Sequence, residues 1–195
     1  MPILSLMQIG WLIVLLATWG ALLFGGFLFG RPSQFSSRRI PALNCLLSSL
    51  VLVLAAWSWV IFVRKTPAAG FALLIAIGMS LGFLGDVFMA GLISIGDRLL
   101  SGMAAFGLGH VAYIIAGLCY SYQSGLTALW PRLFGWLLWL FIGFLGWYFV
   151  AYRSSRPSFL HWAALLYSLL LSSTAGIATG LALQSVRFVP FALGA

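Results

Sequence analysis

An aspartate inside an apolar segment is the residue of this sequence best suited to chemistry. Asp86 lies between Gly78 and Gly91 in a long apolar run, and it is one of only two acidic residues in the chain. Inserting an aspartate at the centre of a membrane costs about 2.5–3.5 kcal/mol, so such a residue is kept where it faces a protein interior or a wet cavity. Asp86 is therefore a candidate for acid–base catalysis, unless it lies near the membrane surface as a cap. Asp97, beside Arg98 in a polar turn, is expected to be solvated.

A histidine and a tyrosine in the next apolar run are candidates to work with the aspartate. His110 and Tyr113 are three residues apart, so they share one face of a helix. Asp86 precedes Asp97 by 11 residues and His110 follows Arg98 by 12, which predicts that the two side chains lie at matching depth on adjacent helices. His110 could instead be a hydrogen-bonding packing residue, and Tyr113 could simply fill space.

Small residues surround these positions. Gly78 and Gly82 are four residues apart, Gly85 directly precedes the aspartate, and Gly109 precedes the histidine. Such glycines let helix backbones approach closely. We expect Gly82, Gly85 and Gly109, together with Tyr113, to border a substrate pocket, although close packing alone would also explain the glycines.

Other catalytic chemistries find little support. With two His, two Asp and no Glu, we expect no metal site, and no phosphate-binding glycine loop or serine-hydrolase elbow suggests a cofactor or a serine nucleophile. Cys45 and Cys119 both lie inside apolar runs and are expected to act as small hydrophobic residues. The serines and threonines after residue 167 are interpreted as helix-packing residues: Ser168, Ser172, Ser173, Thr174 and Thr179.

The composition excludes a soluble domain. Of the 195 residues, 63% are hydrophobic and 6% are charged, against about 25% charged in soluble proteins. The net charge of +8 does not indicate nucleic-acid binding, because the cations are spread between apolar runs, where lipid headgroups attract them. The partner that the composition predicts is the lipid bilayer.

The elements that must position the site are membrane-spanning helices. Lipid cannot satisfy backbone hydrogen bonds, so long apolar runs must be helical. The sequence predicts one all-α membrane domain over residues 1–195, with six complete helices and the start of a seventh at Phe188. The six complete runs are Ile3–Phe29, Ala42–Val63, Ala69–Ile95, Leu99–Tyr122, Leu133–Tyr152 and Phe159–Leu183. The seventh run stops after eight residues, too few to cross a core of about 30 Å, so we expect the chain to be incomplete at its C-terminus.

The cations between the runs weakly favour an orientation. An external N-terminus would leave six arginines inside and four cations outside, in agreement with the positive-inside rule. The inner set is Arg31, Arg38, Arg39, Arg98, Arg153 and Arg156, and the outer set is Arg64, Lys65, Arg132 and Arg187.

The segment from Gly78 to Tyr113 resembles the signature of the YhhN-like family of integral membrane proteins. The matching pieces are Gly85-Asp86 and the stretch from Phe106 to Tyr113. The resemblance implies about eight helices in a multi-pass protein of a bacterial inner membrane. It also implies a second motif, Ser-Asp, in the seventh helix. Residues 191–195 look like the lead-in to that motif, so we expect the Ser-Asp to follow within about ten residues of Ala195.

Characterised members of that family are lysoplasmalogenases, so the resemblance implies a lysophospholipid substrate and no cofactor. These enzymes hydrolyse a vinyl ether to a fatty aldehyde and a glycerophospho headgroup. Asp86 would deliver the proton, the second aspartate would place the water, and His110 would orient Asp86 or relay its proton. The chain that ends at Ala195, without the second carboxylate, is expected to be inactive. A proton-coupled carrier that uses the same pair as a relay stays open as the alternative.

Overall fold

The computed structural model describes residues 5–32, 38–39, 41–93, 96–152 and 158–194. A short antiparallel pair, β1 (Arg31–Pro32) and β2 (Arg38–Arg39), lies in the link after the first helix. A π-helical turn over Tyr148–Tyr152 continues the fifth helix, and a 3-10 turn over Val186–Phe188 precedes the last. The helices are α1 (Leu6–Leu28), α2 (Ala42–Val63), α3 (Ala69–Met89), α4 (Arg98–Gln123), α5 (Leu129–Trp147), α6 (Phe159–Gln184) and α7 (Val189–Gly194).

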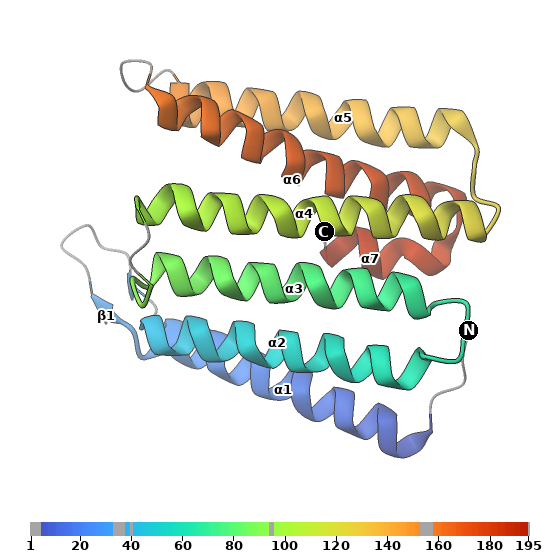
Figure 1. Ribbon diagram of the computed structural model, residues 1–195, viewed down its shortest axis with the longest axis horizontal. Helices are drawn as coiled ribbons and strands as arrows, with labels where there is room; N and C mark the ends of the chain where they lie inside the picture. The colour runs from blue at the N-terminus through green and yellow to red at the C-terminus, as the bar shows by residue number, and fades with distance from the viewer. Residues whose placement is uncertain (1–4, 33–37, 40, 94–95, 153–157, 195) are drawn as a thin grey trace.

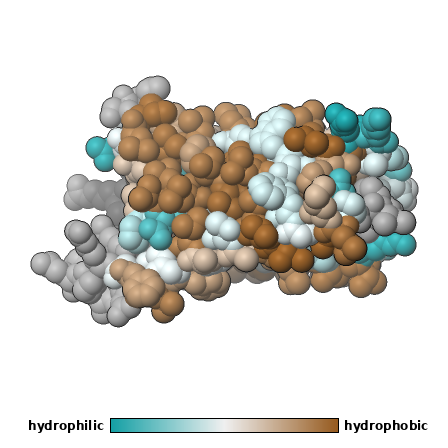
Figure 2. All heavy atoms as spheres, turned by 90° about the horizontal axis from the view of Figure 1, so that it is seen from below, coloured by the Kyte–Doolittle hydropathy of each residue, from teal (hydrophilic) through white to brown (hydrophobic). Residues whose placement is uncertain are grey.

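The predicted all-α membrane fold is confirmed. Six of the helices are long and apolar enough to cross a bilayer, and α7 is a short seventh helix. Apolar side chains cover the middle of the face in Figure 2, and hydrophilic ones gather mainly toward the ends. Lipid would cover such a surface, so the protein is an integral, multi-pass membrane protein. Which way it is oriented stays a prediction; Arg153 and Arg156 of the inner set lie outside the described residues.

One helix ends earlier than its apolar run. The run predicted to reach Ile95, itself outside the described residues, is helical only to Met89. Gly91 follows with a φ of +73°, and the amide of Leu92 donates to the carbonyl of Val87 at 3.2 Å. A glycine in the left-handed region with this backbone bond is a common helix terminator. The link between α3 and α4 is therefore longer than predicted.

The helices form a row whose order departs once from the chain order. Figure 1 shows α1, α2, α3 and α4 side by side, then α6, then α5 at the far edge. Among the described residues α4 packs against α3 and α6, whereas α5 packs against α6. The short helix α7 folds back beside this row, with Phe191 against Phe71 at 5.7 Å between ring centroids.

Glycines allow close approach of two pairs of helices, α3 with α4 and α5 with α6. A Cβ on Gly109 of α4 would lie 3.0 Å from the carbonyl oxygen of Gly78 on α3. A Cβ on Gly135 of α5 would lie 2.8 Å from the carbonyl oxygen of Gly176 on α6. Larger residues do not fit at either place, so the glycines allow the backbone contact that replaces hydrophobic packing in lipid.

Indole N–H groups tie neighbouring helices together. An indole donor has no water partner in the bilayer, and each of four tryptophans donates to a hydroxyl on an adjacent helix. The pairs are Trp11 with Ser58 at 3.0 Å, Trp57 with Ser80 at 3.1 Å, Trp136 with Ser173 at 3.0 Å and Trp139 with Thr179 at 2.9 Å. Ser173 and Thr179 are thus helix-packing residues, as predicted.

Candidate functional site

A cavity that contains the side chains of Asp86 and His110 lies between α2, α3 and α4. Its volume is about 230 Å³. The residues that line it are Ser49, Leu52, Gly78, Met79, Gly82, Phe83, Asp86, Phe106, Gly109, His110 and Tyr113. The structure therefore brings together five of the six predicted site residues. The sixth, Gly85, is buried beneath the Phe106 ring, where a Cβ would lie 2.8 Å from the ring, and it does not line the cavity.

Asp86 is half-buried and hydrogen-bonded to α2. Its carboxyl oxygen Oδ2 forms a hydrogen bond with the hydroxyl of Ser49. The same hydroxyl lies 3.1 Å from the carbonyl oxygen of Cys45, one turn earlier in α2. The carboxyl group is thus held toward the cavity by a neighbouring helix rather than left to lipid.

His110 is anchored to α6. Its Nδ1 lies 3.0 Å from the hydroxyl of Thr174, and that hydroxyl donates to the carbonyl of Leu170 at 3.2 Å. If the single hydroxyl proton goes to the carbonyl, Nδ1 of His110 carries a proton and donates to the hydroxyl oxygen. The neutral ring then has its lone pair on Nε2, which can accept a proton. Tyr113 and Tyr167 hold the ring edge-on, each at 5.8 Å between ring centroids.

The register between α3 and α4 fixes the relative depth of the two groups. Close contacts pair Gly78 with Tyr113, Gly85 with Phe106 and Met89 with Gly102. In this antiparallel register Asp86 is level with Ala105, five residues before His110. At 1.5 Å per residue, the two backbone positions differ in depth by about 7.5 Å. The described residues include no hydrogen bond between them.

The two backbone positions are thus offset by about one and a half helix turns rather than level, although both side chains line the same cavity, as the prediction that they face each other requires. The prediction counted residues from the Asp97 turn as if both helices ended there, but α3 ends at Met89. Residues 90–97 form the link, so the aspartate lies in the last turn of its helix rather than near mid-depth. Asp97 itself is exposed and caps α4, accepting from the amides of Leu99 at 2.8 Å and Leu100 at 3.0 Å.

Two residues of the site escaped the sequence analysis. Ser49 belongs to a Ser-Ser pair inside the otherwise apolar α2, a weak signal because single hydroxyls are common in membrane helices. Thr174 was assigned to packing with its neighbours, and only the contact between α4 and α6 distinguishes it from them. In the described part of the chain no three His, Cys, Asp or Glu side chains come close enough to hold a metal ion.

Comparison with known protein families gives a match over most of the chain. The model of the YhhN family matches residues 44–195, from the third residue of α2 through α7. The chain belongs to the YhhN family. All residues of the cavity fall within the matched range of this YhhN protein. Neither the curated proteins nor the solved structures yielded a match.

Proposed function

We propose that this YhhN protein is a membrane-embedded hydrolase that cleaves the vinyl ether bond of lysoplasmalogens. The observation that carries the proposal is the carboxyl group of Asp86, held inside a transmembrane bundle in a cavity that it shares with His110. A cavity of about 230 Å³ accommodates the reacting end of a lysolipid and leaves most of the acyl chain to the bilayer.

The reaction needs an acid before it needs a nucleophile. Asp86 would transfer its proton to the vinyl carbon that bears the alkyl chain, leaving an oxocarbenium ion at the carbon bound to oxygen. The resulting carboxylate would stabilise this cation. Water then adds to the cation, and the hemiacetal that forms breaks into a fatty aldehyde and the free hydroxyl of the glycerophospho headgroup. One water is consumed, and no redox partner is required.

Proton counting at Ser49 supports a protonated acid. A serine hydroxyl has one proton, yet Ser49 is within hydrogen-bond distance of two acceptors, the Cys45 carbonyl and the Asp86 carboxyl group. Both bonds form together if the hydroxyl donates to Cys45 and a protonated Asp86 donates to the hydroxyl. This is the form that the first step of the reaction consumes.

His110 supports the second step. With Nδ1–H engaged by Thr174, the lone pair of Nε2 can accept a proton from the attacking water. The phenol of Tyr113 lines the same cavity and is a candidate hydrogen-bond donor to the substrate.

The test is aldehyde release from a lysoplasmenyl lipid by the protein expressed from its full reading frame and reconstituted in liposomes. Asp86→Asn is expected to abolish turnover and leave folding intact, because the amide is cheaper to bury than a carboxylate and cannot supply an acidic proton. Asp97→Asn is the matched control: it changes the other acidic residue, which is exposed, and asparagine also caps helices well. The control should retain turnover.

Full activity of Asp86→Asn would refute the assigned role. If the wild-type protein releases no aldehyde but dissipates a proton gradient when a solute is offered, the carrier replaces the hydrolase. The six long helices of the described structure favour the hydrolase, since carriers commonly bind substrate at helices broken near mid-membrane.

A further inference from the structure

A second cavity lies on the other side of α4, where α4 and α5 do not pack together. It has a volume of about 380 Å³, within the range of small-molecule sites, and shares no residue with the Asp86 cavity. Seven of the ten residues that line it are apolar or aromatic: Ile114, Leu118, Leu129, Leu133, Trp136, Ile177 and Leu181. The polar ones are Ser121, Arg132 and Ser173.

Arg132 is the charged residue of this cavity. It lies in the first turn of α5 and is half-buried. Its guanidinium donates to the hydroxyl of Ser121, which is 1% exposed, and lies 5.3 Å from the centroid of the Tyr122 ring. The last turn of α4 thus fixes the cation beside an apolar cavity. A guanidinium has five N–H donors, so the bond to Ser121 leaves donors for a ligand.

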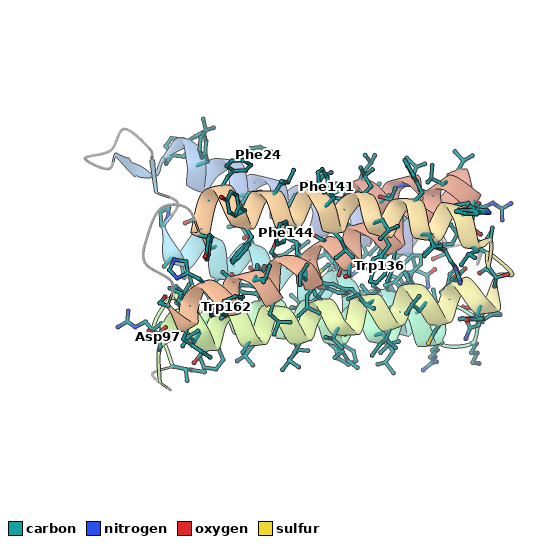
Figure 3. All side chains as sticks on the ribbon, turned by 90° about the horizontal axis from the view of Figure 1, so that it is seen from above. Phe24, Asp97, Trp136, Phe141, Phe144 and Trp162 are labelled. Atoms are coloured by element: carbon teal, nitrogen blue, oxygen red, sulfur yellow. The ribbon has the colours of Figure 1, made fainter. Side chains whose placement is uncertain are left out.

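Neither side-chain carboxylate of residues 1–195 lies near Arg132. The chain has two acidic residues, and Asp97 lies at the opposite end of α4, visible at one end of the bundle in Figure 3. It is 24 residues from Ser121, about 36 Å along the helix. Asp86 is level with Ala105, which lies about 24 Å from Ser121 along α4. Neither acidic side chain of residues 1–195 can therefore serve as the counter-ion of Arg132.

We propose that this cavity binds a membrane phospholipid, with one acyl chain between α4, α5 and α6 and the phosphate on Arg132. The apolar walls match an acyl chain, and the position of Arg132 at a helix end matches the level of the headgroups. Arginine presents paired donors that fit the oxygens of a phosphate. The site is separate from the proposed active site, and binding there does not depend on turnover.

Photo-crosslinking in detergent micelles tests the site. The probe is a lysophosphatidylglycerol with a diazirine in its acyl chain, and the comparison probe is an uncharged monoacylglycerol with the same chain. We expect the phosphate probe to label the peptides that contain Leu118 or Leu133. Arg132→Gln should lower this labelling by roughly tenfold, the loss of one charge-assisted bond. Arg64→Gln, which removes an exposed cation after α2 at the same end of the bundle, should leave it unchanged.

Leu118→Trp provides a test that leaves the arginine in place. Leu118 lines the cavity and is 39% exposed, so a larger side chain there should fill the space and abolish labelling without disturbing the buried core. Excess inorganic phosphate should not displace the probe, because the acyl chain holds it as well.

Four results would overturn the proposal. Equal labelling by the uncharged probe would mean that Arg132 plays no part. An equal loss in Arg64→Gln would mean general attraction to the basic end of the bundle. Full labelling of Leu118→Trp would place the acyl chain elsewhere, and displacement by inorganic phosphate would mean a site for a free anion.

Discussion

The hydrogen bond between His110 of α4 and Thr174 of α6 allows a direct test of how the proposed active site is held. We predict that Thr174→Val slows aldehyde release while the protein still folds. Thr174 is 4% exposed, and valine has nearly the same shape, so the change removes one hydrogen-bond partner without removing volume. What is lost is the hydroxyl 3.0 Å from Nδ1 of His110, which holds the orientation of the ring.

The size of the effect follows from the energy of such bonds. Hydrogen bonds between membrane helices contribute about 0.6–1.7 kcal/mol, so the free energy of unfolding should fall by about 1 kcal/mol. If the same energy is lost from the transition state, turnover should fall by about three- to twentyfold. The loss should appear in kcat rather than in KM, because the hydroxyl touches the histidine and not the substrate.

A second threonine of the same helix is the matched control. Thr179 accepts a hydrogen bond of 2.9 Å from the indole of Trp139, away from the cavity. Thr179→Val should lower stability by a similar amount and leave kcat unchanged, and Thr174→Ser should restore activity because it keeps the hydroxyl. Initial rates of aldehyde release and thermal unfolding in detergent give both quantities. Equal kcat for Thr174→Val and wild type, or equal losses in both valine variants, would refute a positioning role.

Three further predictions rest on single contacts. Ser49→Ala should reduce aldehyde release but leave measurable activity, because the hydrogen-bond partner of the acid is lost and the acid itself remains. Gly135→Ala should lower the unfolding free energy by about 1–3 kcal/mol, since its Cβ would lie 2.8 Å from a backbone oxygen of α6. Gly146→Ala is the control: its Cβ would have no atom within 4 Å, so the unfolding free energy should stay unchanged. Gly82→Ala should alter KM without loss of stability, because its Cβ would enter the cavity and meet no other atom. An unchanged KM together with a loss of stability would place the substrate elsewhere.

The helices could be predicted from sequence because lipid leaves the backbone few alternatives. The predicted second run, Ala42–Val63, has the same limits as α2, and the predicted sixth run ends one residue before α6 does. Long apolar runs bounded by charged residues determine such limits almost alone. The grouping of Asp86 with His110 and Tyr113 was also predictable, because adjacent helices with short links pack side by side.

Register and helix order depend on contacts that spacing does not encode. The termination of α3 at Gly91 lengthened the link and moved Asp86 along its helix relative to His110. The packing of α4 against α6 rather than α5 made Thr174 the partner of the histidine. Both outcomes depend on side-chain contacts between helices, and a single sequence does not show which side chains are in contact.

The shallower position of Asp86 suits the proposed substrate better than mid-depth would. Asp86 is three residues from the end of α3, about 4.5 Å along the helix. The vinyl ether of a lysoplasmalogen joins the acyl chain to the glycerol, so the bond to be cleaved lies at the boundary between hydrocarbon and headgroups. A relay that carries protons across the membrane would instead need titratable groups spaced through a core of about 30 Å. Asp86 and His110 together span about 7.5 Å of that depth, which suits local proton transfer to a lipid.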